Sequence, residues 1–318
     1  MKKNHYTIGF DLGGTKLAAA LVRGDGSIVD FIKVPVNLQS EGSPKKAQQR
    51  VIHLMADVAL DFKVRFPALL SSKKFRGVGL ASAGPLNVET GTLINPTNFR
   101  GWKTVPIRQL LQTELKKRKF STTVHFQNDA MASALAEGWV GAAKKDRSYA
   151  VVTVGTGIGS GLILNGRPCQ SRGAGSEFGH ILCDLRGLQS EPQSRAHFTA
   201  EGLASGTALL RRAKELGFKG TSVEELVMEK NPIYQPLFDD MAWALASLCY
   251  NLSIGFNLDA IYLSGGLIKI KELYFAQMKT RYRQLVRDFN PLFECPLSIA
   301  KTKNQAGVLG AAYLPYLK

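Results

Sequence analysis

The hydrophobic and polar positions follow the same order of patterns twice along the chain. Residues 6–22, "YTIGFDLGGTKLAAALV", place a glycine turn between two apolar runs, which predicts a strand, a turn and a strand. The turn "RGDG" then leads into a third predicted strand, "SIVDFIKVPV". Residues 149–169, "YAVVTVGTGIGSGLILNGRPC", repeat this plan with strand, turn, strand, turn and strand. The repetition predicts two similar α/β domains that each begin with a three-stranded meander.

Helices and further strands follow each meander. In the first half a helix is predicted because apolar residues share one of its faces, namely Val51, Leu54, Met55, Val58 and Phe62. "FRGVGLASAGPL" predicts a buried strand, "LKKRKF" ends a basic helix, and "TTVHFQ" predicts a strand that runs into the helix "NDAMASALAEGWVG". In the second half we expect the longest helix within "PLFDDMAWALASLCYNLSIGF" and a strand in "DAIYLSGGLI".

The two expected domains face each other across a cleft. The N-terminal domain would comprise residues 1–127 plus 304–318, because the closing helix "GVLGAAYLPYL" is expected to pack back on it. Residues 128–303 would form the larger C-terminal domain. No low-complexity linker separates the two, so the hinge is expected near residues 127 to 130.

Composition narrows the class of protein. The 318 residues include 45% hydrophobic and 21% charged residues, which is typical of a soluble globular protein. No apolar run indicates a signal peptide or a membrane span, so we predict a cytoplasmic protein without a membrane partner. The four cysteines lie far apart in the sequence, which argues against a disulfide framework.

The net charge of +16 is concentrated in the first part of the chain. Up to Gln127 there are 20 basic and 8 acidic residues. The clusters "SPKK", "SSKKFR" and "LKKRKF" lack interleaved aromatic residues, which favours a solvated basic face over a nucleic-acid partner. Such a face would also attract a polyanionic substrate such as ATP.

Two glycine turns, "DLGGTK" and "VGTGIGSG", are candidates for binding phosphate groups. A glycine backbone can approach a phosphate chain closely and donate N–H groups to it, and Asp11 could hold Mg²⁺ through water. Tight hairpins would be the structural alternative. Neither turn matches a Walker loop or GxGxxG. The candidate nucleotide-binding residues are Asp11, Gly13, Gly14, Thr15, Gly155, Thr156, Gly157, Gly265 and Gly266.

Six segments together resemble the ROK family of bacterial sugar kinases. They are "FDLGGTK", "NDAMASALAEGW", "VGTGIGSGLILNG", "GAGSEFGH", "AEGLASGTAL" and "LSGG", in order along almost the whole chain. The resemblance implies an α/β protein of the actin-like ATPase (ribonuclease H-like) fold, with two duplicated domains flanking a cleft. It further implies ATP-dependent phosphorylation of a hexose with Mg²⁺, commonly at the 6-hydroxyl and in a homodimer.

The same resemblance assigns roles to polar residues. Asp129 would be the general base that accepts the proton of the sugar hydroxyl, although an aspartate opening a helix is also a common N-cap. The residues that would surround the sugar are Asn98, Asn128, Asp129, Glu177, His180 and Glu201. Taken alone, Asn98 could be a turn residue and Glu201 an acid that stabilises the start of a helix.

The stretch "SEFGHILCD" raises the question of a metal site. In most family members the histidine matching His180 binds zinc with three cysteines of a CxCGxxGC string. Here the matching positions are Pro192, Ser194 and Thr199, none of which is a usual zinc ligand. We therefore predict no zinc, with His180 as a sugar contact and Thr199 as a helix cap. A degenerate site built on Cys183 and His197 would require the loop to rearrange.

Other functions and other sugars stay open at this stage. Some ROK proteins are sugar-responsive transcriptional regulators, but they carry a helix-turn-helix module ahead of the first strand, and here that strand begins at Tyr6. A filament or chaperone ATPase of the same fold would not need the sugar-binding residues. Glucose or a hexosamine is the preferred substrate, and N-acetylglucosamine, fructose and mannose are alternatives.

Overall fold

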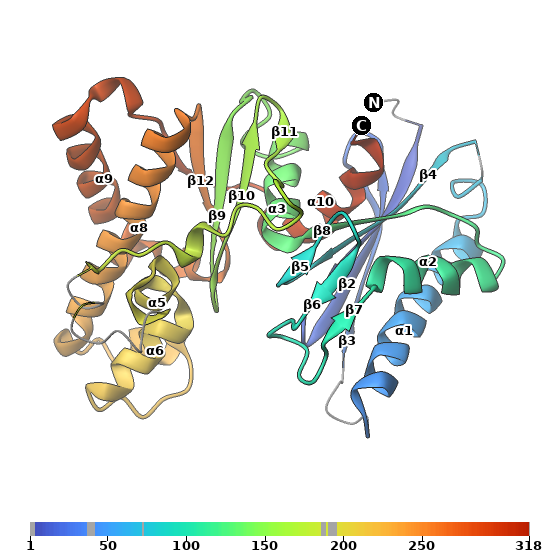
Figure 1. Ribbon diagram of the computed structural model, residues 1–318, viewed down its shortest axis with the longest axis horizontal. Helices are drawn as coiled ribbons and strands as arrows, with labels where there is room; N and C mark the ends of the chain where they lie inside the picture. Colours follow the sequence, from blue (N-terminus) through green and yellow to red (C-terminus); the bar gives the residue numbers. More distant parts are fainter. Residues whose placement is uncertain (1–3, 37–41, 72, 186–188, 190–195, 318) are drawn as a thin grey trace. The chain divides into compact units, whose positions relative to one another are not determined.

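The computed structural model describes residues 4–36, 42–71, 73–185, 189 and 196–317. The chain divides into two compact units (Figure 1). Unit 1 comprises residues 1–144, 168–175 and 304–318, and unit 2 comprises residues 145–167 and 176–303. No helix within the described ranges is long and apolar enough to cross a membrane.

Unit 1 is built on a mixed sheet of five strands in the order β3-β2-β1-β4-β8. The predicted meander forms its antiparallel part, and β4 and β8 add parallel to β1. Three short strands, β5, β6 and β7, make a separate small sheet among the described residues. The bounds are β1 Tyr6–Leu12, β2 Lys16–Arg23, β3 Ile28–Pro35, β4 Phe75–Ser82, β5 Leu86–Asn87, β6 Thr92–Ile94, β7 Thr104–Val105 and β8 Val124–Asn128.

Helices cover both faces of this sheet. On one face α1 and α2 enclose the main core, and on the other face α10 packs against α3 and the central strands. Gly9 and Gly79 allow this close approach, because a Cβ at either position would lie about 2 Å from a carbonyl oxygen of α10. The prediction that the closing helix packs on the first domain is confirmed. The bounds are α1 Pro44–Arg65, α2 Ile107–Lys117, α3 Asp129–Trp139, η6 Lys303–Gln305, α10 Ala306–Tyr313 and η7 Leu314–Tyr316.

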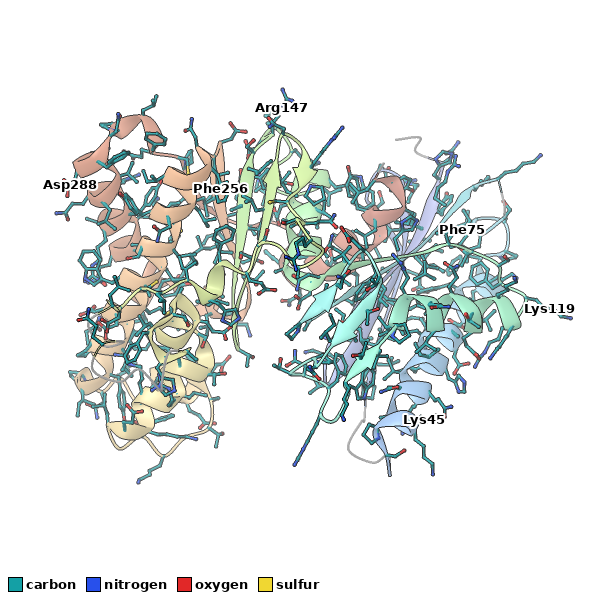
Figure 2. The ribbon with its side chains drawn as sticks, in the orientation of Figure 1. Lys45, Phe75, Lys119, Arg147, Phe256 and Asp288 are labelled. Carbon is teal, nitrogen blue, oxygen red and sulfur yellow. The ribbon has the colours of Figure 1, made fainter. Side chains whose placement is uncertain are left out.

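Some of the basic residues of unit 1 lie on and beside its helices α1 and α2. Lys45 at the start of α1 and Lys119 just after α2 point outward (Figure 2). Some cations are neutralised locally, since Arg65 pairs with Asp30 and Asp61. Lys116 and Lys117 lie in the last turn of α2, where cations favour the helix dipole, as the sequence predicted.

Unit 2 repeats the meander and the parallel additions. Its sheet has the order β11-β10-β9-β12-β13, with β9 and β10 antiparallel and β12 parallel to β9. The longest helix of this unit is α8, where it was predicted. The bounds are β9 Tyr149–Val154, β10 Ile158–Leu164, β11 Arg167–Pro168, η1 Phe178–His180, α5 Ala200–Ala204, α6 Gly206–Glu215, α7 Val223–Met228, η3 Pro232–Tyr234, α8 Gln235–Phe256, β12 Ala260–Ser264, η4 Gly266–Leu273, α9 Phe275–Phe289, η5 Pro291–Phe293 and β13 Leu297–Ile299.

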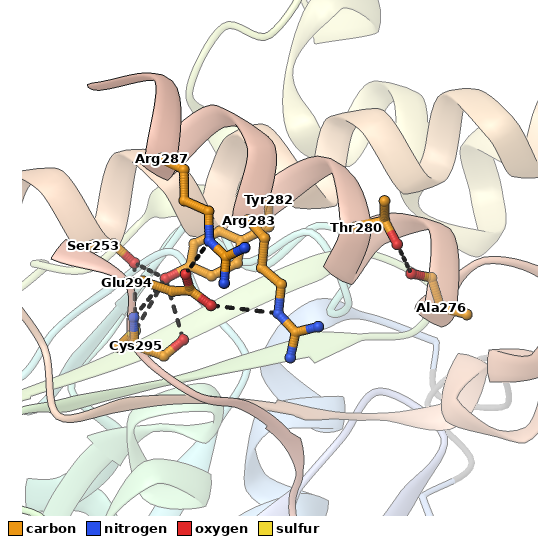
Figure 3. Close-up of polar contacts among 8 residues, drawn as sticks. All are labelled: Ser253, Ala276, Thr280, Tyr282, Arg283, Arg287, Glu294 and Cys295. Carbon is orange, nitrogen blue, oxygen red and sulfur yellow. Dashed lines mark hydrogen bonds and ion pairs between the residues drawn. The ribbon is translucent and has the colours of Figure 1, made fainter. Parts of the chain in front are cut away.

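A buried polar network joins α8, α9 and the segment before β13 (Figure 3). The Ser253 and Tyr282 hydroxyl oxygens lie 2.8 Å apart, and the Cys295 amide donates to the Tyr282 hydroxyl over 3.0 Å. At the surface beside it, Glu294 pairs with Arg283 and Arg287. Because every buried polar group here has a partner, the network fixes how these elements pack.

The division by packing differs from the expected domain boundary. We expected the second domain to begin at Asn128, but α3 belongs to unit 1 and the units divide after Lys144. The reason is that α3 makes its most extensive contacts with α10, through Ala132 and Ala136. Where the chain bends during function is a separate matter, and a hinge near residues 127 to 130 stays a prediction.

Candidate functional site

The carboxyl ends of three parallel strands bring two aspartates of unit 1 together. In the register of the sheet, Asp11 on β1 lies beside Ala81 on β4, and Ser82 lies beside Asn128 at the end of β8. Since these strands run in the same direction, Asp11 and the Asn128–Asp129 junction lie at the same end of the sheet, where the three strands have their carboxyl ends. This end is where the sequence placed the base and the candidate magnesium ligand.

Asp11 lies against the start of α10. A Cβ at Gly307 would lie 2.2 Å from an Asp11 carboxylate oxygen, so glycine is needed there for the helix to reach the strand. Burial and, to a smaller extent, the nearby charge of Asp129 raise the pKa of Asp11 to about 7, although Lys16 and Lys33 act in the opposite direction. At neutral pH this carboxyl is therefore partly protonated when no cation is bound.

Asp129 is the first residue of α3, and the helix cap is its neighbour. The Asn128 side chain accepts hydrogen bonds from the amides of Ala130 (2.9 Å) and Met131 (3.2 Å), so Asn128 is the N-cap. The alternative interpretation of Asp129 as the N-cap is therefore wrong, because Asp129 is already the first residue of the helix. Burial raises the pKa of Asp129, while a hydrogen bond of 2.8 Å from the Ala130 amide acts against this rise.

A buried glutamine supports the same junction. Gln127 is only 2% exposed, and its side-chain oxygen accepts a hydrogen bond of 2.8 Å from the Asn128 amide. The amide of Asn128 would otherwise lie at the end of an edge strand, so this bond helps to fix the turn from β8 into α3. Sequence analysis missed this role. The signal available was a long polar side chain at the end of an otherwise apolar strand.

The glycine turn of unit 1 places Asn98 beside it. The Gly13 amide donates to the Lys16 carbonyl over 3.0 Å, which closes the hairpin, and the exposed Thr15 lies at its tip. A Cβ at Gly14 would lie 2.6 Å from the backbone oxygen of Asn98. The predicted nucleotide turn and the predicted sugar residue Asn98 are therefore in direct backbone contact.

In unit 2 the second glycine turn is joined by helix α6. The Gly155 amide donates to Gly157, and the Gly155 carbonyl accepts from the Gly206 amide over 2.8 Å. The Thr207 hydroxyl donates to the Thr156 carbonyl over 2.9 Å. Sequence analysis did not include this helix start in the site. The short string "SGT", with Ser205 as the N-cap of α6, was the signal that could have indicated it.

Gly265 and Gly266 lie on the other side of this turn. Gly265 has a φ of 96°, and a Cβ there would lie 2.4 Å from the Val154 carbonyl oxygen, so the position requires glycine. A Cβ at Gly155 would lie 3.9 Å from the Gly266 amide nitrogen. The predicted glycines of unit 2 thus lie close together, and a backbone without side chains allows close approach of phosphate groups.

The acidic sugar-binding candidates of unit 2 lie around the start of β10. One Glu201 carboxylate oxygen accepts a hydrogen bond of 2.7 Å from the Ile158 amide. Thr199 caps α5 by accepting from the Gly202 amide over 3.0 Å, which confirms its predicted role in holding the helix of Glu201. Glu177 and His180 belong to the η1 turn and are exposed to solvent.

The η1 turn packs directly on β10. A Cβ at Gly179 would lie 2.0 Å from the Ile158 carbonyl oxygen, so only glycine permits this contact. Ile158 therefore contacts two parts of the site. Its amide donates to Glu201, and its carbonyl oxygen lies against Gly179 in the turn that carries Glu177 and His180. The structure brings Glu177, His180 and Glu201 to one end of the unit 2 sheet.

The residues considered for a degenerate metal site have other surroundings. Burial raises the pKa of the Cys183 thiol to about 11, which disfavours the thiolate that binds metals. Its sulfur lies 3.8 Å from the Ile181 carbonyl oxygen and 3.9 Å from that of Ala244. Across the described ranges no three His, Cys, Asp or Glu residues lie close enough to hold a metal. Pro192 and Ser194 lie outside the described residues, and the absence of zinc stays a prediction.

Comparison with known proteins decides the family. The sequence matches the ROK family over residues 7–316. The chain belongs to the ROK family. It is 27% identical to a glucokinase from Streptomyces coelicolor, over 97% of this chain and 96% of the relative. It is 26% identical to an N-acetylmannosamine kinase from Haemophilus influenzae, over 96% of this chain and 94% of the relative.

The fold agrees with this assignment. The structure is similar to that of a ROK hexokinase from Thermus thermophilus, with a TM-score of 0.79 and 28% identity, covering 98% of both chains. The ROK kinases have the actin-like ATPase fold, and the prediction of an α/β protein of this fold is confirmed. The repeated meander seen in the sequence is the duplicated core of that fold.

Proposed function

We propose that this ROK family member, an ATP-dependent sugar kinase, transfers a phosphoryl group to the 6-hydroxyl of a hexose, with Asp129 as the general base. Glucose or a hexosamine is the preferred substrate. The observation that carries the proposal is the pair of aspartates at one end of the unit 1 sheet, with the pKa of both carboxyls raised by burial. A carboxylate with a raised pKa accepts a proton more readily at neutral pH.

The role of Asp129 follows from how it is held. Asn128 caps α3, so the Asp129 carboxylate is not taken up by the cap and accepts hydrogen bonds from the amides of Ala130 and of Asp129 itself. These bonds leave acceptor positions on the carboxylate for a sugar hydroxyl. In the proposed reaction the hydroxyl oxygen attacks the terminal phosphorus of ATP, the proton passes to Asp129, and ADP leaves.

Asp11 is the residue in unit 1 that fits Mg²⁺. Its pKa of about 7 shows that burial and Asp129 together disfavour its charged form, and a divalent cation would favour that form again. When bound, Mg²⁺ neutralises charge on the phosphate groups. The turns at Gly13–Thr15, Gly155–Gly157 and Gly265–Gly266 would hold the nucleotide through backbone amides other than those of Gly13 and Gly155, which already donate within their turns.

The candidate sugar-binding residues are Asn98, Asn128 and Asp129 in unit 1 and Glu177, His180 and Glu201 in unit 2. Carboxylates and amide oxygens accept hydrogen bonds from sugar hydroxyls, while amide nitrogens donate to them. The related glucokinases and N-acetylmannosamine kinases act on different sugars, so the hexose itself has to be determined by assay.

A coupled assay of ADP release with a panel of hexoses tests the proposal. Glucose, glucosamine, N-acetylglucosamine, N-acetylmannosamine, mannose and fructose would be offered with Mg-ATP. We expect one or two of them to give sugar-dependent ADP release and a 6-phosphorylated product. Release of ADP without any dependence on sugar would favour an ATPase of the same fold, and no release at all would contradict the proposal.

A further inference from the structure

A buried serine on β10 holds the turn that carries Glu177. Ser160 is 5% exposed and lies between Gly159 and Gly161, which have no side chains of their own. Its hydroxyl accepts a hydrogen bond of 3.1 Å from the Phe178 amide and donates one to the Ser176 carbonyl. These are the peptide groups immediately before and after Glu177, so one hydroxyl fixes the backbone on both sides of that residue.

The turn needs this support because its backbone is locally unfavourable. Ser176 has a φ of 75°, a left-handed conformation that is unfavourable for a non-glycine residue. Phe178 opens the η1 turn, so its amide has no acceptor within that turn. The Ser160 hydroxyl supplies this acceptor and at the same time binds the carbonyl of the strained residue.

The same strand also fixes the second acid. Ile158 and Ser160 are two residues apart on β10, and each of them makes a hydrogen bond to one of the two acid-bearing segments. The Ile158 amide holds Glu201 over 2.7 Å, and the Ser160 hydroxyl holds the turn of Glu177. The two attachment points are separated by about 7 Å along a rigid strand. The relative position of the two acids is thus set by β10.

We propose that Ser160 is a positioning residue for sugar binding: its hydroxyl holds Glu177 and His180 in the conformation that binds the sugar. This inference rests on the proposed function, because it takes Glu177 and His180 as sugar contacts. Ser160 does not itself touch the sugar, and it takes no part in phosphoryl transfer. Its loss should therefore affect sugar binding before it affects turnover or the affinity for ATP.

The first test is the kinetics of Ser160→Ala with the best hexose of the panel. Loss of two hydrogen bonds to the turn should raise the KM for the sugar about 10-fold. The kcat and the KM for ATP should change by less than about twofold, because interactions with the nucleotide are untouched. An unchanged KM for the sugar would overturn the proposal, and so would a 10-fold fall in kcat without a change in KM.

Ser253→Ala is the matched control. Ser253 is also a buried serine of unit 2 with two hydroxyl contacts, to the Tyr282 hydroxyl and the Cys295 sulfur, but it lies in the network of Figure 3. We expect this variant to melt at a lower temperature and to keep the KM for the sugar. If both variants raised the KM equally, the effect of Ser160→Ala would be general destabilisation and the proposal would fail.

Hydrogen exchange at the Phe178 amide tests the contact without any activity. In the wild-type protein this amide should exchange slowly because Ser160 accepts its hydrogen bond, and in Ser160→Ala it should exchange about 10-fold or more faster. Rapid exchange in the wild-type protein would show that the contact is not formed. A wild-type protein that phosphorylates no sugar would overturn the proposed function, whereas an active one with unaffected Ser160→Ala kinetics would overturn this inference alone.

Discussion

The two units hold their acidic residues in different ways. In unit 1, Asp11 and Asp129 are partly buried, and this burial raises the pKa of both carboxyls. In unit 2, Glu201 is tied to a backbone amide and Glu177 follows a turn fixed on β10. Burial changes the pKa of a carboxyl group, whereas hydrogen bonds fix the position of the residue that carries it. Under the proposed function, this difference would mean that unit 1 provides the base and unit 2 positions the sugar.

The sharpest test of this contrast is Asp129→Asn. The amide keeps the hydrogen bond from Ala130 and the cap of Asn128, so the fold should be unchanged. Loss of the base should lower kcat by about 10²–10⁴-fold while sugar binding, measured by calorimetry, is retained. Asp25→Asn, an exposed acid paired with Arg23, serves as the control and should keep full activity. Near wild-type turnover in Asp129→Asn would mean that the carboxylate is not the base.

Glu201→Gln tests the other half of the contrast. Glutamine keeps an oxygen for the Ile158 amide but loses the charge that would bind sugar hydroxyls. Loss of a charged hydrogen bond should raise the KM for the sugar about 10- to 100-fold. The melting temperature should stay close to that of the wild type. A large fall in kcat with an unchanged KM would place Glu201 in the chemistry instead.

The pH dependence of stability tests the burial of Asp11. The pKa of Asp11 is about 7 in the folded protein and near 3.8 in the unfolded protein. Its favourable contribution to the free energy of unfolding is therefore fully present below pH 3.8. That contribution is lost as the pH rises through about 7. Asp11→Asn should therefore gain in melting temperature relative to the wild type, by about 5 °C more at pH 8 than at pH 5 without nucleotide. If the difference in melting temperature between Asp11→Asn and the wild type were the same at pH 5 and pH 8, the raised pKa would be contradicted.

The metal content of the purified protein sharpens the account of unit 2. We expect no stoichiometric zinc, and chelators should neither unfold nor inactivate the protein while Mg²⁺ is replenished. His180→Ala should raise the KM for the sugar about 10-fold with only a small fall in melting temperature, because no metal binding energy is lost with the side chain. One zinc per chain that leaves together with activity would reverse this interpretation of His180.

The smallest effect is expected from the basic face of unit 1. Its exposed lysines, such as Lys45 and Lys119, should bind duplex DNA weakly and without sequence preference. Such binding depends on counterion release and should disappear at about 0.2 M salt. Sequence-specific binding that persists at that salt concentration would revive the regulator alternative. Charge reversal at Lys45 should leave sugar phosphorylation unchanged.

The sequence predicted the elements better than it predicted their partners. Glycine turns between apolar runs indicated both meanders, and the closing helix was expected on the first domain, where α10 packs. The membership of α3 in unit 1 could not be predicted, because it depends on small residues that fit α10 only in three dimensions. The repeated pattern can be recognised from neighbouring residues in the sequence, whereas the helix against which α3 packs depends on residues far away in the sequence.

The site shows the same limit. Candidate acids followed from motifs, but their supports did not, since Gln127 and Ser160 lie in strands where a polar side chain has no obvious role. Ser160 in particular lies within an alternating run of glycines that attracts attention to phosphate binding instead. Its partners, Ser176 and Phe178, are far along the chain, so their contact depends on folding rather than spacing.

The close contact of α10 with Gly9 and Gly79 has a consequence for the order in which the protein is made. Strands β1 and β4 are synthesised early, but the helix that covers one of their faces follows the whole of unit 2. On the ribosome, residues 145–303 therefore emerge before unit 1 can complete its core. During that interval the apolar face around Ala20 and Val22 can pack against Ala136 of α3 but lacks the α10 residues Val308, Leu309 and Ala312, so part of it stays exposed on the growing chain.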